Sequence, residues 1–298
     1  MNKFKNHLIA LTAVLALVCT FALPTASASK DLTYTTIDFP GAIRTGAFGI
    51  NGKGEVVGFY RDAAGTHGFL LSGGNFTSID FPGAVATDAR GINAKGDIVG
   101  TYSSQGRLHG YLLSEGIFTT VDFPGHLNTI AQRITPSGLI LGCYHDMDIM
   151  ESMHGFTVRG DDFNEFDVPA SMHNGATPNG KTIVGLYTDM TTGKKRGYVL
   201  KRGEFNPFDV PGSNLTEAWD INPEKEIVGF YRDLTGKFYG FLRTDDDDDA
   251  AAFTTIDYPG AVATRAFGIN PGGDVVGSYV DSRGKTHGFL LTRTEQDQ

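Results

Sequence analysis

Residues 38–71 read DFPGAIRTGAFGINGKGEVVGFYRDAAGTHGFLL, and this stretch decides the fold because the chain repeats it. Its opening Asp-x-Pro motif begins at Asp38, Asp80, Asp122, Asp167, Asp209 and Asp257, so successive copies lie 42, 42, 45, 42 and 48 residues apart. Counterparts of the Val-Val-Gly-Phe-Tyr and His-Gly-Phe-Leu-Leu segments follow in phase in every copy. Several motifs in a fixed order at a nearly constant period indicate six copies of one supersecondary unit.

Each copy has the pattern of four short strands. In the first copy the β-branched and aromatic runs are residues 33–39, 45–50, 55–61 and 68–72, each bounded by turn residues. The sequence NGKG at residues 51–54 suits a tight hairpin, since Asn and Gly tolerate positive φ. Six units of four antiparallel strands predict an all-β fold, a six-bladed β-propeller of four-stranded blades.

Two architectural alternatives remain open at this stage. Two β-trefoils of three units each would need a linker near Gly160, where the sequence shows no lengthening. Within the propeller, either each unit forms one blade, or the first strand completes a blade built from the last three strands. We expect one domain, residues 29–298, with repeats at about 32–74, 75–116, 117–161, 162–203, 204–252 and 253–293.

The N-terminus has the features of an export signal. Lys3 and Lys5 precede an apolar run from Leu8 to Leu23, and the small residues that end at Ala28 suit a signal peptidase. We therefore predict a signal peptide at residues 1–28, cleaved after Ala28, and a secreted or periplasmic protein. The run is shorter than the roughly 20 residues that span a bilayer, so no transmembrane anchor is expected after cleavage.

Charge and cysteine content argue against a nucleic-acid partner and against an intrachain disulfide. The net charge of −9 would repel a nucleic-acid backbone, so no nucleic-acid partner is expected. If Cys19 leaves with the signal, Cys143 is the one cysteine left, and stability must come from burial rather than from an intrachain disulfide.

The repeated strings resemble a known family. The pattern Gly-Ile-Asn-x-x-Gly-x-Val-Val-Gly, Tyr-x-Asp and His-Gly-Phe-Leu-Leu, seen at residues 268–277, 279–281 and 287–291, is similar to the bacterial extracellular repeats of the HAF family. The middle position of the family's His-Ala-Phe motif is Gly in all six units here. The resemblance implies export and a repeated β fold, and it carries no established activity.

Loop lengths favour one side of the propeller for binding. We call the side with the loops after Pro-Gly and after Tyr-x-Asp the first face, and the side with the Asn-x-x-Gly hairpins the second face. The spacing from the Tyr position to the His position varies between 7 and 10 residues on the first face, whereas the second face is uniform apart from an insertion with five aspartates at residues 245–249. Loops that vary on a constant scaffold usually carry specificity, so we expect binding on the first face.

Variable positions inside the second strand of each unit supply the candidate binding residues. They flank a recurring alanine, and the set is Phe48, Asp88, Arg90, Gln132, Glu217, Trp219, Arg265 and Phe267. Aromatic rings beside arginines and carboxylates suit sugars or other polar small molecules if this strand lines the channel. The alternative for the aromatic members is packing between blades.

Residues that recur in every unit are better explained by the fold. We expect the aspartates of Asp-x-Pro to be turn hydrogen-bonders and the histidines His67, His109, His154 and His287 to bond at strand ends. The cluster of His145, Asp146, Asp148, Glu151 and His154 matches no metal spacing, so we expect a solvated loop and no cofactor, with calcium the one ion left open. Cys143 is expected to fill a strand position.

Three functions remain in competition. The leading hypothesis is an exported, non-enzymatic binding scaffold for a polysaccharide, a small polar ligand or a cell-surface protein. The second is a glycan-active hydrolase or lyase, with Asp88 and Glu217 as acid and base and Arg265 as anion clamp. The third is a structural or adhesive surface protein. The sequence contains no Ser-His-Asp signature, phosphate loop or Cys-x-x-Cys motif, and it therefore assigns no catalytic residue.

Overall fold

The computed structural model describes residues 31–146, 153–166, 170–244 and 252–294. The predicted signal peptide, residues 167–169, the aspartate run at 245–249, and Asp148 and Glu151 lie outside these ranges. The described residues contain twenty-four strands and no helix, which confirms the all-β prediction. The predicted strands of the first copy agree with the observed ones to within two residues at each end.

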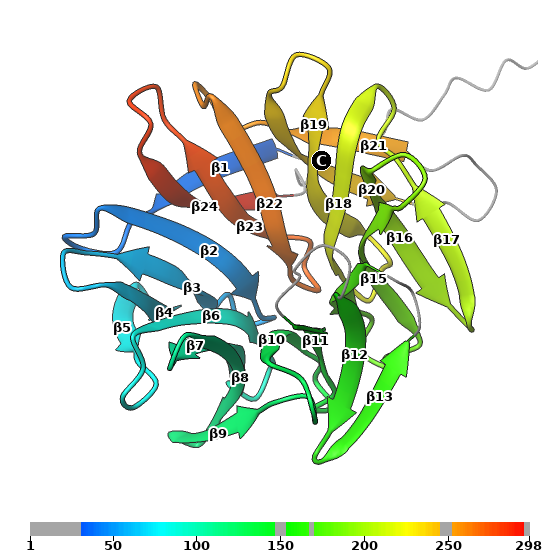
Figure 1. Ribbon diagram of the computed structural model, residues 1–298. Coiled ribbons are helices and arrows are strands. Elements are labelled where there is room, and N and C mark those ends of the chain that lie inside the picture. The colour runs from blue at the N-terminus through cyan, green and yellow to red at the C-terminus, as the bar shows by residue number, and fades with distance from the viewer. Residues whose placement is uncertain (1–30, 147–152, 167–169, 245–251, 295–298) are drawn as a thin grey trace, which may run out of the picture.

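The strands surround a central axis in the arrangement of a β-propeller (Figure 1), and the two β-trefoils are not formed. The strands nearest the axis are β2 (Arg44–Ile50), β6 (Ala86–Ile92), β10 (Asn128–Ile134), β14 (Ser171–Ala176), β18 (Ser213–Ile221) and β22 (Ala263–Ile269). Each pairs with the next strand outward: β3 (Val56–Arg61), β7 (Ile98–Ser104), β11 (Ile140–His145), β15 (Thr182–Asp189), β19 (Ile227–Asp233) and β23 (Val275–Val280).

The third and fourth strands complete each antiparallel set. The third strands are β4 (Thr66–Ser72), β8 (Arg107–Ser114), β12 (His154–Arg159), β16 (Lys194–Lys201), β20 (Phe238–Thr244) and β24 (Thr286–Thr294). The peripheral strands are β5 (Asn75–Ile79), β9 (Ile117–Val121), β13 (Asp162–Phe166), β17 (Glu204–Phe208), β21 (Ala252–Ile256) and β1 (Asp31–Ile37).

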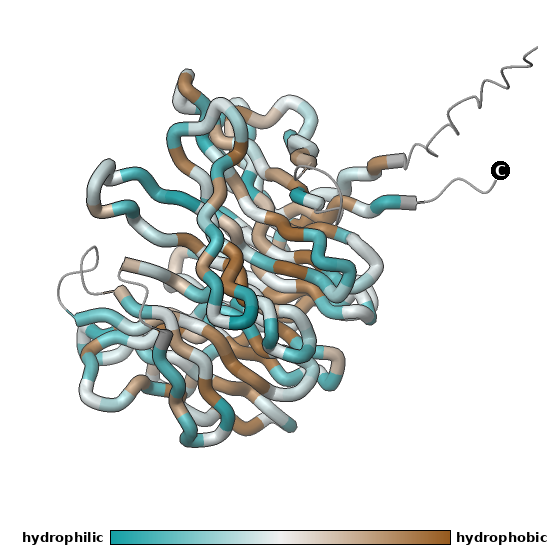
Figure 2. Tube along the Cα trace, turned by 90° about the vertical axis from the view of Figure 1, so that its right-hand side faces the viewer, coloured by the Kyte–Doolittle hydropathy of each residue, from teal (hydrophilic) through white to brown (hydrophobic). Residues whose placement is uncertain are grey.

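The first strand of the described chain pairs with the last. β1 runs antiparallel to β24 over seven residue pairs, from Asp31 opposite Thr294 to Ile37 opposite Gly288. The sheets are therefore offset by one strand from the sequence repeats, which settles the phase that the sequence left open. The two ends of the described chain leave the body side by side (Figure 2).

The strands form five sheets, not six separate ones. Four sheets have four strands each, and the fifth has eight. The eight-stranded sheet consists of β2–β5 and β6–β9, joined by a single parallel pair between Thr66 of β4 and Ala86 of β6. Both residues are the first of their strands.

The core lies between neighbouring sheets, and hydrophobic segments occupy the middles of the strands (Figure 2). Each third strand places one fully buried aromatic ring there: Phe69, Tyr111, Phe156, Tyr198, Phe241 and Phe289. The second strands supply a glycine opposite each ring. At Gly58 a Cβ would collide with the Gly46 carbonyl oxygen and lie 2.8 Å from Phe69 Cε1, so the close packing of strand and ring requires glycine there.

The recurring aspartates and histidines bind one another. His67 Nδ1 lies 2.6 Å from Asp80 Oδ1, and the same bond recurs between His109 and Asp122 and between His287 and Asp38. Arg196 takes the place of the histidine in one unit and donates to Asp209, and in the unit where Tyr239 holds that position the nearby Lys237 donates to Asp257. The structural role and the strand-end bonding are confirmed for these residues, but the aspartate's partner is a side chain on a neighbouring strand rather than a turn amide.

The unit built from β14–β17 departs from the others at a buried position. His173 occupies the place that alanine holds in the other five inner strands, is fully buried, and shares a hydrogen bond through Nδ1 with the Tyr198 hydroxyl. Burial lowers the pKa of His173 from 6.5 to about 4. The folded protein therefore keeps this imidazole neutral where the unfolded chain protonates it.

This histidine predicts acid sensitivity. Between pH 6.5 and pH 4 the unfolded state binds the extra proton, so the free energy of unfolding falls as the pH falls, by about 2 kcal/mol between pH 7.5 and pH 5. His173→Ala restores the residue of the other inner strands and removes this contribution. Urea unfolding of both proteins at pH 7.5 and pH 5 measures the difference, and equal pH dependence in the two would refute this role.

Candidate functional site

Each inner strand carries a β-bulge at the same place. The register between inner and second strand shifts just after the recurring alanine, or after His173 in β14. The extra residues are Phe48, Arg90, Gln132, Asn174, Trp219 and Phe267. Bulges re-aim side chains. Five of the eight predicted binding residues are thus the inserted residues of a repeated bulge, a feature that strand periodicity did not predict.

Arg90 organises one side of the candidate site. Its guanidinium donates to both oxygens of Asp88, at 2.9 Å each, and to Gln132 Oε1 at 3.0 Å. It also lies over the Phe48 ring, 5.4 Å from the ring centre. Asp88 accepts a further bond from the Thr101 amide, so both oxygens of this carboxylate already have partners.

Aromatic rings connect this group to the other side. Phe48 meets Phe267 edge-on at 5.2 Å, and Phe267 meets Trp219 at 4.8 Å. Phe267 is buried, whereas Phe48 and Trp219 are half-buried. The aromatic residues therefore pack on one another near the axis, which combines the two roles that the sequence left open for them.

A buried carboxylate lies beside the tryptophan. Glu217 Oε2 accepts a hydrogen bond from Trp219 Nε1 at 3.3 Å, and Glu217 Oε1 is 3.6 Å from Lys195 Nζ, which β16 supplies. Burial raises the pKa of Glu217, and Lys195 partly offsets it. Arg265 lies 4.0 Å from the centre of the Phe238 ring, and burial lowers the pKa of this arginine while Glu217 opposes that shift.

Hydrogen bonds and ring contacts, together with the charge interaction between Glu217 and Arg265, connect the eight predicted residues. We call this set the mouth cluster: Phe48, Asp88, Arg90, Gln132, Glu217, Trp219, Arg265 and Phe267. Their chemistry combines ring faces, two guanidinium groups and two carboxylates, which can stack on and hydrogen-bond a polar ligand. Whether they bind one stays a prediction.

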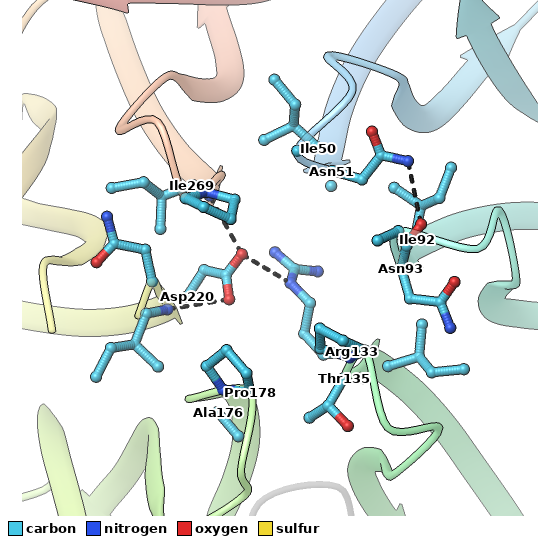
Figure 3. Close-up of a pocket in the computed structure, with 18 of the residues that line it drawn as sticks. Ile50, Asn51, Ile92, Asn93, Arg133, Thr135, Ala176, Pro178, Asp220 and Ile269 are labelled. Carbon is cyan, nitrogen blue, oxygen red and sulfur yellow. Dashed lines mark hydrogen bonds and ion pairs between the residues drawn. The ribbon is translucent and has the colours of Figure 1, made fainter. Parts of the chain in front are cut away.

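Sequence reasoning missed a charge pair on the axis, which we call the plug. Arg133 and Asp220 occupy the position of the glycine in Gly-Ile-Asn, and Arg133 Nε lies 3.2 Å from Asp220 Oδ2 (Figure 3). The replacement of that glycine in these two units was the available signal. Both side chains are largely buried, with 8% and 13% exposure.

The Arg133 guanidinium ties four inner strands together. Nη1 donates to the carbonyl oxygens of Arg90 and Gln132, at 2.6 and 2.9 Å, and Nη2 donates to those of Phe48 and Phe267. Each carbonyl belongs to a bulge residue, so the plug lies directly behind the mouth cluster. Asp220 in turn accepts from the amides of Ile221 and Ile269. Burial raises the pKa of Asp220, and Arg133 opposes the shift.

A cavity of about 140 Å³ lies on the other side of the plug, and we call it the rear pocket. Arg133 and Asp220 form its floor, and residues from the ends of all six inner strands line it (Figure 3). Its rim residues Gly52, Ala94, Pro136, Pro223 and Pro271 are exposed, so the pocket opens to the second face. This cavity therefore lies on the face opposite to the one that loop variation favours.

Five of the seven exposed large apolar side chains among the described residues lie in first-face loops. Ile43, Val85 and Val262 hold equivalent positions in the loops after Pro-Gly, and Met190 and Leu234 lie in loops between second and third strands. Val85 and Leu234 are 79% and 78% exposed. Exposed apolar surface of this kind marks interaction sites when it gathers on one side of a protein.

Three further observations concern metal ligands, the free cysteine and membrane helices in the described part of the chain. No group of three or more His, Cys, Asp or Glu residues is arranged there to hold a metal ion. Cys143 is buried and unpaired, and burial raises its pKa to about 12, so its thiol is a poor nucleophile. Among these residues no helix is long and apolar enough to cross a membrane.

Comparison with known proteins shows the class of fold. No family model matches the chain, and no curated protein matches it. Among solved structures, a putative TolB from Agrobacterium tumefaciens has a TM-score of 0.56 and 12% identity, over 90% of this chain and 99% of that one. TolB from Acinetobacter baumannii has a TM-score of 0.54 and 14% identity, over 81% of this chain and 64% of that one.

A lectin shows a similar likeness. A mutant of Aleuria aurantia lectin in complex with Fucα1-6GlcNAc has a TM-score of 0.51 and 11% identity, over 89% of this chain and 94% of that one. At these identities the likeness is one of fold, and together with the strand topology it makes this protein a β-propeller.

Proposed function

We propose that this chain is an exported, HAF-type β-propeller of six blades that binds a ligand on its first face without chemical conversion. The count of six takes β2–β5 and β6–β9 as two blades, since one parallel residue pair is all that joins them. Export rests on the signal-like residues 1–28. The ligand class that fits the mouth cluster is a polysaccharide or a smaller polar sugar.

The observation that carries the proposal is the composition of the first face. The half-buried rings of Phe48 and Trp219 are flanked by Arg90 and Glu217 at the axis, and exposed aliphatic residues surround them on the loops. A sugar ring offers apolar C–H faces to aromatic rings and hydroxyl groups to guanidinium and carboxylate groups. Both halves of that chemistry are present in one connected set of side chains.

The hydrolase alternative is less well supported. Asp88 accepts a two-pronged interaction from Arg90 and a bond from the Thr101 amide, which leaves it poorly placed to activate water. Glu217 is buried with a raised pKa, as a general acid requires, but its charged neighbours are Lys195 and Arg265 rather than a second carboxylate. Binding without cleavage is therefore the better reading.

The first experiment is a retention screen of residues 29–298 on polysaccharides and a glycan array, with and without calcium, while released products are measured. We expect retention without products. Trp219→Leu keeps apolar packing on Phe267 but removes the aromatic face, and should weaken binding at least tenfold, as loss of a central aromatic contact does at other interfaces. Release of products that Glu217→Gln abolishes would overturn the proposal in favour of the hydrolase.

A matched pair of variants tests which face binds. Val85 and Ile117 are both exposed aliphatic residues, 79% and 68%, but Val85 lies on the first face and Ile117 follows a second-face hairpin. Val85→Ser should weaken retention, whereas Ile117→Ser should leave it unchanged. The opposite outcome would place binding on the second face.

A further inference from the structure

We propose that the rear pocket is a second binding site, which takes a small organic cation with an apolar body of about benzene size. It does not depend on the proposed function, because the pocket opens on the other face and the plug separates it from the mouth cluster.

The volume of the pocket sets the size of the ligand. An apolar cavity of roughly 150 Å³ accepts a benzene-sized molecule, and the rear pocket holds about 140 Å³. Its lining is mostly apolar: isoleucines end five of the six inner strands, and prolines form much of the rim. The isoleucines are Ile50, Ile92, Ile134, Ile221 and Ile269.

The floor of the pocket sets the charge of the ligand. Nη1 and Nη2 of Arg133 donate to four main-chain carbonyls, and Nε lies against Asp220 Oδ2 at 3.2 Å, so the arginine is already committed to the protein rather than to a ligand. Asp220 differs, because its Oδ1 accepts one bond, from the Ile221 amide, whereas Oδ2 has two partners. A carboxylate oxygen accepts two bonds, so Oδ1 of this lining residue keeps one acceptor position, which we expect to favour a donor group that carries positive charge.

The depth of the pocket comes from one substitution in the repeat. Ala176 ends β14 where isoleucine ends the other five inner strands. Beside it, Leu141 is the one second-strand residue that lines the pocket, although it is fully buried. The pocket therefore reaches inward beside Ala176, where a larger side chain would fill it.

A titration of the folded protein with benzylamine tests the site. Calorimetry and the shift in melting temperature both measure the binding. Benzoate has the same size with the opposite charge, and toluene lacks a donor. We expect saturable binding of benzylamine, with at least tenfold weaker binding of benzoate and toluene. Equal binding of all three, or none by benzylamine, would overturn the proposal.

The matched variants separate the pocket from non-specific binding. Ala176→Ile restores the residue of the other units without touching the plug and should weaken benzylamine binding at least tenfold. Ala64→Ile adds the same bulk on an exposed first-face loop and should leave it unchanged. Unaltered binding in a folded Ala176→Ile protein would place the amine elsewhere. Retention of polysaccharide should not respond to benzylamine, so the two proposals can fail independently.

Discussion

Replacement of Arg133 by alanine is expected to lower the free energy of unfolding by about 3–5 kcal/mol. The change leaves the Asp220 carboxylate buried without its counter-ion and removes the donors from four main-chain carbonyls, those of Phe48, Arg90, Gln132 and Phe267. Four inner strands lose their common partner at once. Chemical denaturation monitored by circular dichroism measures the free energy of unfolding of both proteins.

A double-mutant cycle identifies the pair as the cause. Asp220→Ala should also cost about 3–5 kcal/mol, and the double variant should cost less than the sum of the two, because neither charge is then left unpaired. Lys237→Ala, which breaks the more exposed pair with Asp257, should cost about 1 kcal/mol or less. Strict additivity of the two plug variants, or a plug effect no larger than that of Lys237→Ala, would contradict the role we assign to it.

Removal of β1 is expected to have the second large effect. A chain that starts at Asp38 instead of Ser29 loses the seven-residue pairing with β24 and the buried side chain of Ile37, which is 4% exposed. Loss of a buried isoleucine alone costs about 2–5 kcal/mol. With the open strand edge added, we expect the melting temperature to fall by about 10 °C or more.

Addition of β1 as a separate peptide distinguishes the loss of ring closure from unspecific destabilisation by the truncation. A synthetic peptide of residues 29–43 should add itself to the exposed edge of β24 and recover most of the lost melting temperature, whereas a scrambled peptide should not. A truncated protein as stable as the full chain, or one indifferent to the peptide, would show that β1 does not close the ring.

The repeat predicted the architecture because its motifs carry physical requirements. Pro40, which cannot donate to a ladder, lies in the turn that follows the end of β1 at Ile37. Gly58 recurs because the buried ring of Phe69 and a neighbouring carbonyl exclude a side chain. The strand boundaries followed from such residues. The joining of two strand sets at Thr66 and Ala86 did not, because one main-chain pair depends on the exact separation of neighbouring sheets.

The candidate site was only half visible in the sequence. Variation at the residues flanking the recurring alanine located the mouth cluster, and the contacts of Arg90 and Phe267 show that these positions meet. The sequence did not predict the plug, because Arg133 and Asp220 are 87 residues apart and each replaces a glycine within a single repeat. Their pairing depends on the diameter of the ring, a property that no single repeat contains.

The bulges explain why periodicity alone could not place these side chains. Strict alternation assigns every second residue to one face of a strand, and an extra residue after Ala47 breaks that rule within β2. The inserted residue of the bulge, such as Gln132 in β10, and the residue after it, such as Arg133, can then both take part in contacts near the axis.

The most direct test of the account is a fluorescence titration of Trp219, which is the single tryptophan of the chain and lies in the mouth cluster. The probe is the oligosaccharide unit of whichever polysaccharide retains the protein. The account predicts a saturable change in tryptophan emission, with no change in the sugar after prolonged incubation, and at least tenfold weaker binding for Val85→Ser. Binding of that sugar without any response from Trp219 would contradict it, because the ligand would then lie away from the first-face axis.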